Sequence, residues 1–86
     1  MRLEQLKYFA EVVKAKSINK AAHNLYMTQP ALSKAINALE DEIGYKLLKR
    51  SNYGVILTAE GKKIYEETLQ ILQTIAGWSR TNELGP

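Results

Sequence analysis

The segment from Thr28 to Gly44 constrains the fold of this 86-residue chain more than any other part of it. Thr28 is a good N-cap, because its hydroxyl can accept a hydrogen bond from a free amide of the first helical turn. Pro30 stands in that turn, where its missing N–H costs no helical hydrogen bond. The apolar residues that follow are spaced by four, three and four: Leu32, Ile36, Leu39 and Ile43. This pattern predicts an amphipathic helix that ends at Gly44, a residue suited to the left-handed conformation after a helix.

Two shorter helices are predicted before this segment. A first helix over 3–13 is indicated by apolar residues at helical spacing: Leu3, Leu6, Phe9, Ala10 and Val13. Ser17 is a second good N-cap and predicts a helix over 18–25. The buried face of that helix would consist of Ile18, Ala21, Ala22 and Leu25. Its small alanines allow the helix that follows to cross it closely.

A hairpin and a long helix are predicted after Gly44. Short apolar segments at 46–49 and 55–57 flank Ser51-Asn52-Tyr53-Gly54, a cluster of turn formers, and together they predict a β-hairpin. Thr58 is placed to cap a last helix over 59–79, which would be about 30 Å long at a rise of about 1.5 Å per residue. The expected fold is therefore mainly α, with three helices, a two-stranded hairpin and a long final helix.

The last helix carries two apolar rows, which is more than three short helices can cover. One row is spaced by four, three, four and three: Ile64, Thr68, Ile71, Ile75 and Trp78. The other row lies one residue along: Tyr65, Leu69, Leu72 and Ala76. We expect one row to seal the core of the domain and the row from Ile64 to Trp78 to meet a second copy in a symmetric dimer. The alternative is a helix that is wholly buried in a larger protein.

The composition indicates the cellular compartment in which such a chain is found. It has no cysteine, which excludes disulfides and thiolate metal sites and suits a reducing cytoplasm. No run approaches the roughly 18 apolar residues of a membrane span, and the first residues lack the apolar core of a signal peptide. We therefore expect a cytoplasmic protein without a membrane partner.

The charge is distributed unevenly, although the net charge of +3 is modest. No acidic residue stands between Glu11 and Glu40, where the basic side chains are Lys14, Lys16, Lys20, His23 and Lys34. A second acid-free stretch, 43–59, contains Lys46, Lys49 and Arg50. Ordinary fluctuation in a short sequence is one explanation. The other is an anionic partner, because both stretches coincide with the motifs described next.

The helix after Thr28 begins with the side chains that a DNA-reading helix needs. In a helix-turn-helix the second helix places its N-terminal side chains in the major groove, and its positive end attracts phosphate. The candidates for DNA binding on this helix are Thr28, Gln29, Pro30, Ala31, Ser33, Lys34 and Asn37. Gln29 can present both amide atoms to an adenine edge, and Pro30 and Ala31 offer apolar surface to a thymine methyl. Singly each also fits a cap, a helix start or a solvated face, but together they occupy one helical face within an acid-free stretch.

Four pieces of the chain together resemble the signature of LysR-type transcription regulators. They are Ser17-Ile18-Asn19-Lys20-Ala21-Ala22, the stretch from Thr28 to Glu40, Leu47-Leu48-Lys49-Arg50, and Leu57-Thr58-Ala59-Glu60-Gly61. The resemblance implies a winged helix-turn-helix over 1–58, a linker and dimerisation helix over 59–80, and a tail over 81–86 that starts a linker to a separate effector domain. It further implies a dimer formed by the linker helix, with any small-molecule effector bound by that other domain. Two copies joined in this way would set two recognition helices about one DNA turn, or a multiple, apart, so we expect them to read an inverted-repeat operator in double-stranded DNA.

The resemblance also assigns roles to residues. Gln29, Pro30, Ser33 and Lys34 correspond to recognition-helix contacts, Thr28 and Ala31 to the groove-facing start of that helix, and Arg50 to the wing residue that enters the minor groove or grips phosphate. An arginine at a hairpin tip suits a narrow, negative minor groove, although a solubilising edge charge is the plainer alternative. Many relatives have glutamine at the position of Ala35 and a basic residue at that of Asn37, so base preference is expected to differ.

An enzyme and a protein-interaction module are the two alternative classes of function. An enzyme is disfavoured, because the chain has one histidine, His23, no nucleophile-base pair and no glycine-rich phosphate loop. Glu40, Asp41 and Glu42 are consecutive, so their side chains point in different directions and fit a solvated helix end better than a cation site. We therefore expect no metal and no cofactor. A protein-interaction module built on the long helix is the second alternative, and salt-dependent duplex binding separates it from a DNA reader.

Overall fold

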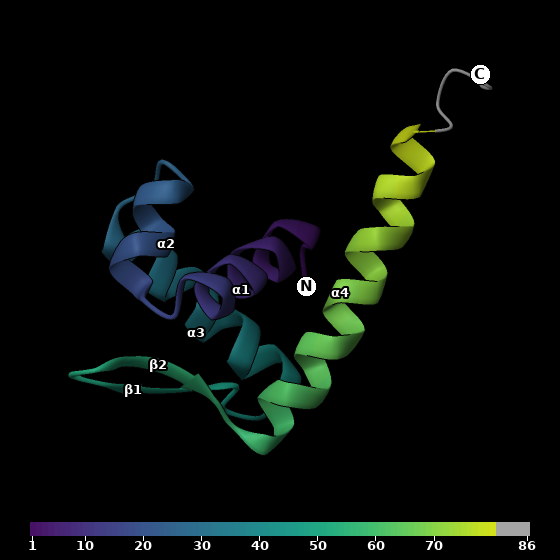
Figure 1. Cartoon of the computed structure of the whole chain (residues 1–86). Helices are drawn as coiled ribbons and strands as arrows, with labels where there is room; N and C mark the ends of the chain where they lie inside the picture. The colour runs from purple at the N-terminus through teal and green to yellow at the C-terminus, as the bar shows by residue number, and fades with distance from the viewer. Residues whose placement is uncertain (81–86) are drawn as a thin grey trace.

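The computed structural model describes residues 1–80, with side chains as far as Trp78, so the predicted tail at 81–86 lies outside the described residues. The elements in chain order are α1 (Leu3–Ala15), α2 (Ile18–Asn24), α3 (Gln29–Ile43), β1 (Leu48–Ser51), β2 (Gly54–Leu57) and α4 (Ala59–Arg80). Figure 1 shows α1, α2 and α3 packed together, the β1-β2 hairpin extending to one side, and α4 rising away from the hairpin. The predicted order of elements is confirmed.

Local capping explains where the helices begin and end. The hydroxyl of Ser17 accepts a hydrogen bond from the N–H of Lys20 at 3.1 Å, and that of Thr28 accepts one from the N–H of Ala31 at 3.2 Å. Gly44 ends α3 with a φ of 93°, in the left-handed region that glycine adopts without steric cost. Thr58 caps α4 in the same way, accepting a hydrogen bond from the N–H of Gly61 at 2.9 Å. The three predicted N-caps and the predicted glycine C-cap are confirmed.

The core lies where α1, α2 and α3 meet the hairpin and the start of α4. Its largest fully buried side chains include Phe9, Val12, Leu32, Ile36, Leu39 and Leu47. The hairpin is held to α1 by a hydrogen bond of 3.2 Å from the N–H of Val55 to the carbonyl oxygen of Lys16. This approach requires the glycine at position 54, because a Cβ there would lie 2.5 Å from the same oxygen. The β1-β2 hairpin, the wing of the domain, is thus fixed to the end of α1 through β2.

The first strand begins two residues later than the sequence predicted. Segment 46–49 was expected to be extended and paired, but β1 and β2 pair from Leu48↔Leu57 to Ser51↔Gly54. The backbone before Leu48 forms hydrogen bonds with Thr58. The N–H of Thr58 donates to the carbonyl oxygen of Leu47 at 3.0 Å. The hydroxyl of Thr58 donates to the carbonyl oxygen of Lys46 at 2.7 Å. These bonds join the base of the wing to the start of α4.

Glu40 corrects the expectation of a wholly solvated acidic end on α3. Its side chain is only 4% exposed, and Oε2 accepts hydrogen bonds from the N–H groups of Leu47 at 2.8 Å and Leu48 at 3.2 Å. The Nζ of Lys46 lies 3.6 Å from Oε1. Burial is tolerated because the carboxylate is hydrogen-bonded and paired with a cation. Asp41 and Glu42 are exposed, as expected.

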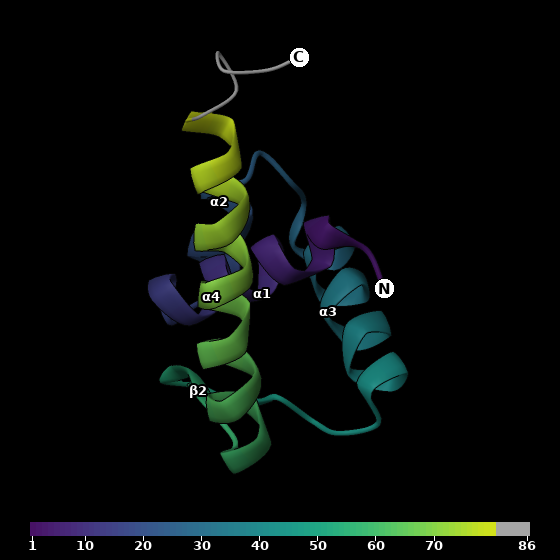
Figure 2. The same ribbon diagram turned by 90° about the vertical axis from the view of Figure 1, so that its right-hand side faces the viewer.

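The apolar row predicted to form the dimer is partly buried in its own domain and partly exposed. Ile64 packs against the core, and Thr68 is 1% exposed within its own chain, so neither is a free surface. Tyr65 of the neighbouring row also packs inward, with its ring edge-on to Phe9 at a centroid distance of 6.0 Å. Figure 2 shows why, since the first half of α4 runs across α1 while its second half continues past it. Ile71 and Trp78 in that second half are exposed.

Candidate nucleic-acid interface

The predicted reading face of α3 lies on the surface of the domain. Thr28, Gln29, Pro30, Ala31, Lys34 and Asn37 are exposed, and Ser33 is half-buried. The opposite side of the same helix carries Leu32, Ile36 and Leu39, which are fully buried. Because these apolar residues fix the rotation of α3 about its axis, the polar residues of its first turns must face solvent. The structure thus brings the predicted residues of α3 together on one face.

The electrostatic character of this face follows from the placement of the acids. Residues 12–39 contain none, and the acids of α3 occupy its last turn, at the far end from Gln29. The positive end of the helix macrodipole therefore lies at the exposed first turn of α3, and Lys34 adds a positive charge in the turn that follows. An anion approaching this end of α3 meets no opposing carboxylate from α3.

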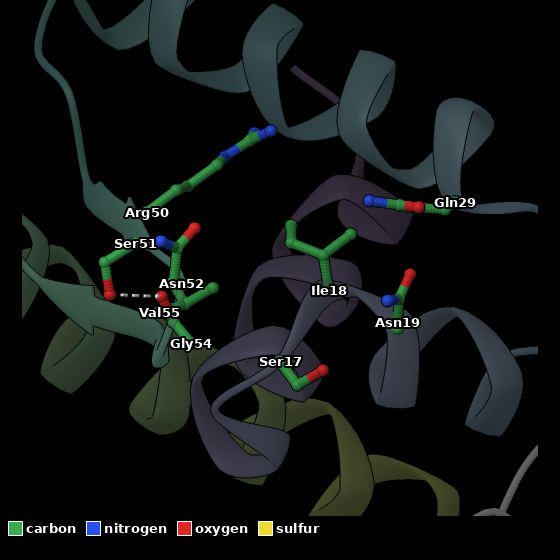
Figure 3. A pocket seen from close by; sticks show the side chains of 9 residues that line it. All are labelled: Ser17, Ile18, Asn19, Gln29, Arg50, Ser51, Asn52, Gly54 and Val55. Atoms are coloured by element: carbon green, nitrogen blue, oxygen red, sulfur yellow. Dashed lines mark hydrogen bonds between the residues drawn. The ribbon is translucent and has the colours of Figure 1, made fainter.

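A polar hollow of about 250 Å³ lies between the start of α2, the start of α3 and the hairpin. Its lining residues are Ser17, Ile18, Asn19, Gln29, Arg50, Ser51, Asn52, Gly54 and Val55, none of them acidic (Figure 3). The side chain of Gln29 reaches into it from α3. Asn19 and Asn52 are not among the residues that the sequence predicts to bind DNA. The signal available for Asn19 was its place in the first turn of a helix inside the acid-free stretch.

Arg50 is placed differently from the expectation. It lies within β1 opposite Val55, and the turn of the hairpin is formed by Asn52 and Tyr53, so Arg50 is not at the tip. Its guanidinium reaches back to α3, where Nη2 donates to the Oδ1 of Asn37 at 3.2 Å and Nη1 to the Oγ of Ser33 at 3.4 Å. Figure 3 shows the side chain directed toward α3. The wing arginine thus belongs to the same surface as the reading face.

Among residues 1–80, no group of three or more histidine, cysteine or acidic side chains is arranged to hold a metal ion. Within the same residues, no helix is long and apolar enough to cross a membrane.

Three helices that bury a common core, with the exposed start of α3 beside a two-stranded antiparallel hairpin, define a winged helix-turn-helix domain. The family profile described as "Bacterial regulatory helix-turn-helix protein, lysR family" matches residues 3–62. The chain belongs to this family, as the sequence motifs predicted.

Curated relatives include the HTH-type transcriptional regulator TfdT of Cupriavidus pinatubonensis, which is 40% identical over 83 residues covering 96% of this chain and 36% of the relative. The HTH-type transcriptional regulator BudR of Raoultella terrigena is 46% identical over 72 residues, covering 84% of this chain and 25% of the relative. The chain therefore spans about a third or less of the length of these relatives.

Solved structures with the same fold include DNA complexes. The DNA-binding domain of BenM with catB site 1 DNA superposes with a TM-score of 0.92 at 36% identity, covering 96% of this chain and 93% of that one. Full-length CbnR complexed with its target DNA gives a TM-score of 0.86 at 38% identity, covering 96% of this chain and 28% of that one.

Proposed function

We propose that this chain binds double-stranded DNA sequence-specifically, as the DNA-binding part of a bacterial transcription regulator that works in the cytoplasm. The observation that carries the proposal is the exposed polar first turn of α3, set by the burial of Leu32, Ile36 and Leu39 behind it. A helix in this position can enter the major groove, where each base pair presents a distinct pattern of donors and acceptors. The DNA complexes of BenM and CbnR, proteins of the same fold, support it.

The residues of the reading face divide by chemistry. Gln29 can donate to and accept from one adenine edge, whereas the small apolar surfaces of Pro30 and Ala31 suit a thymine methyl. Ser33 and Lys34 reach phosphate or base edges from the next turn. Thr28 uses an oxygen lone pair to cap α3, and its hydroxyl hydrogen remains a donor for a phosphate.

Dimerisation through α4 completes the proposed function. The apolar side chains of its second half, Ile71, Ile75 and Trp78, would pack against the same residues of a second copy. Ile71 and Trp78 are 44% and 66% exposed, which is costly for large apolar groups in water. A two-fold axis at this contact sets two α3 helices about 34 Å apart, or a multiple of that distance, and such a dimer reads an inverted repeat. A small-molecule effector would act through a part of the protein outside this chain.

Selection of bound sequences from random duplex DNA tests the proposal. We expect enrichment of an inverted repeat with a fixed half-site spacing, and an affinity whose logarithm falls linearly with the logarithm of salt concentration. Each neutralised phosphate contributes about −0.9 to that slope on B-DNA. Enrichment of no sequence, together with a flat salt response, would refute DNA reading and favour a protein-interaction module built on α4.

A further inference from the structure

The strand register places Arg50 on the inward face of the hairpin. Side chains alternate between the two faces of a strand, and directly opposed residues of an antiparallel pair share a face. Arg50 pairs with Val55, which is buried, and it lies two residues from Leu48, which is also buried. Lys49 and its partner Ile56 occupy the outer face and are exposed. Arg50 therefore extends along the domain toward α3 and not into solvent at the tip.

The contact with α3 fixes the guanidinium and dictates the orientation of Asn37. Arginine has N–H donors and no acceptor, so Asn37 must offer its amide oxygen and turn its NH₂ group away. Ser33 stands one helical turn before Asn37, and the two residues present adjacent acceptors to the two terminal nitrogens. The bonds to Ser33 and Asn37 use two of the five side-chain N–H groups of Arg50.

The charge of Arg50 is left without an anionic partner in the described residues, where the ion pairs join Met1 to Glu42 and Lys46 to Glu40. Neutral acceptors hold the guanidinium in place without cancelling its charge. Arg50 also lines the polar hollow into which Gln29 reaches. A fixed planar fork of donors with a full positive charge suits a phosphate, which arginine binds through two parallel hydrogen bonds.

The family resemblance already assigns Arg50 to the minor groove or to a phosphate. We propose that Asn37 is a positioning residue, which holds the guanidinium of Arg50 toward a backbone phosphate at the edge of the groove that α3 enters. This inference rests on the proposed DNA binding and assigns to Asn37 a role other than reading a base. Ordering of the arginine before DNA arrives reduces the conformational entropy lost on binding. The asparagine therefore acts on affinity for any duplex, and its effect requires Arg50.

A double-mutant cycle on DNA binding tests this assignment. We expect Arg50→Ala to weaken binding about tenfold on both the selected and a random duplex, and to make the salt slope about 0.9 less negative. Asn37→Ala should weaken both duplexes about threefold in the wild-type background and have no effect when Arg50 is already alanine. Lys49→Ala, on the outer face of the same strand, and Asn24→Ala, an exposed asparagine bonded to Glu11, are the matched controls. Loss on the selected duplex alone, additive with Arg50→Ala, would make Asn37 a base reader and overturn the proposal.

A measurement without DNA separates this inference from the proposed function. The ¹⁵N relaxation of the Nε–H group of Arg50 in the free protein reports how ordered the side chain is. We expect an ordered Nε–H in the wild type and in Asn24→Ala, and a mobile one in Asn37→Ala. An Nε–H equally ordered in Asn37→Ala would refute the positioning role even if DNA binding is intact. Absence of duplex binding by the wild type refutes the phosphate contact and the proposed function, while the relaxation result still decides the role of Asn37.

Discussion

Oε2 of Glu40 accepts a hydrogen bond of 2.8 Å from the backbone N–H of Leu47, and this bond ties the end of α3 to the base of the wing. The same oxygen accepts from the N–H of Leu48, where β1 begins. One buried carboxylate therefore satisfies two backbone donors and fixes where the hairpin leaves the helices. Because Arg50 lies two residues further along β1, this connection also sets where its guanidinium meets α3.

Replacement of Glu40 by alanine should lower the free energy of unfolding by about 3 kcal/mol, because two buried N–H groups lose their acceptor. The midpoint of urea unfolding at neutral pH, followed by far-UV circular dichroism, measures this. Asp41→Ala is the matched control, since Asp41 is exposed in the same helical turn. Its removal should leave stability unchanged or raise it slightly, because a negative charge near a helix C-terminus is unfavourable. Equal losses in both variants would show that the bonds of Glu40 contribute nothing specific.

Gly61→Ala should destabilise the domain by about 3 kcal/mol, because a Cβ at this position would overlap the carbonyl oxygen of Leu47. Backbone cannot move aside as a flexible side chain can. At Gly77, in the second half of the same helix, a Cβ would meet no atom within 4 Å apart from those of its chain neighbours and of the adjacent helix backbone. Gly77→Ala should therefore raise the free energy of unfolding by about 0.5–1 kcal/mol through helix propensity. The two thermal midpoints should move in opposite directions, and a shared direction would contradict the packing described.

Lys34→Ala should weaken binding to specific and random duplexes alike and make the log–log salt slope less negative by about 0.9, the contribution of one phosphate contact. Fluorescence anisotropy of a labelled duplex at several salt concentrations gives both quantities. Lys7→Ala is the control, an exposed lysine of α1 outside the reading face. An identical slope change in both variants would mean that only net charge matters, not the position of Lys34.

Gln29→Ala should cost about 1–3 kcal/mol of binding to the selected sequence while leaving random duplex binding nearly intact, because it removes a bidentate contact to one base. Competition binding with the two duplexes measures the difference. Gln73→Ala removes an exposed amide from α4 and should change neither affinity. Equal losses on both duplexes would remove Gln29 from the base readers.

Ile71→Glu should convert the proposed dimer to a monomer, because two copies of the charge would be buried in the contact between the second halves of α4. Sedimentation equilibrium reports the mass, and the inverted repeat should lose far more affinity than a single half-site. Gln73→Glu adds the same charge on the same helix two residues away, a rotation of about 200°. A dimer that persists in Ile71→Glu would place the contact elsewhere.

The local features of this fold were determined by the sequence alone. Ser17, Thr28 and Gly44 act within one helical turn of themselves, so the start of α2 and both ends of α3 are readable from neighbours in the chain. The apolar spacing of α3 fixed its rotation and with it the exposure of Gln29 and Lys34. Short-range hydrogen bonds and helical periodicity do not depend on the rest of the fold, which is why these predictions hold.

Only the tertiary structure decided the features that join distant segments. The burial of Glu40 follows from the return of the chain at Leu47, the burial of Thr68 from the crossing of α4 over α1, and the reach of Arg50 to Asn37 from the register of the hairpin. A helical pattern gives the face on which a residue lies but not which element covers it. That covering depends on how the elements pack, and packing free energy is shared among residues far apart in the chain.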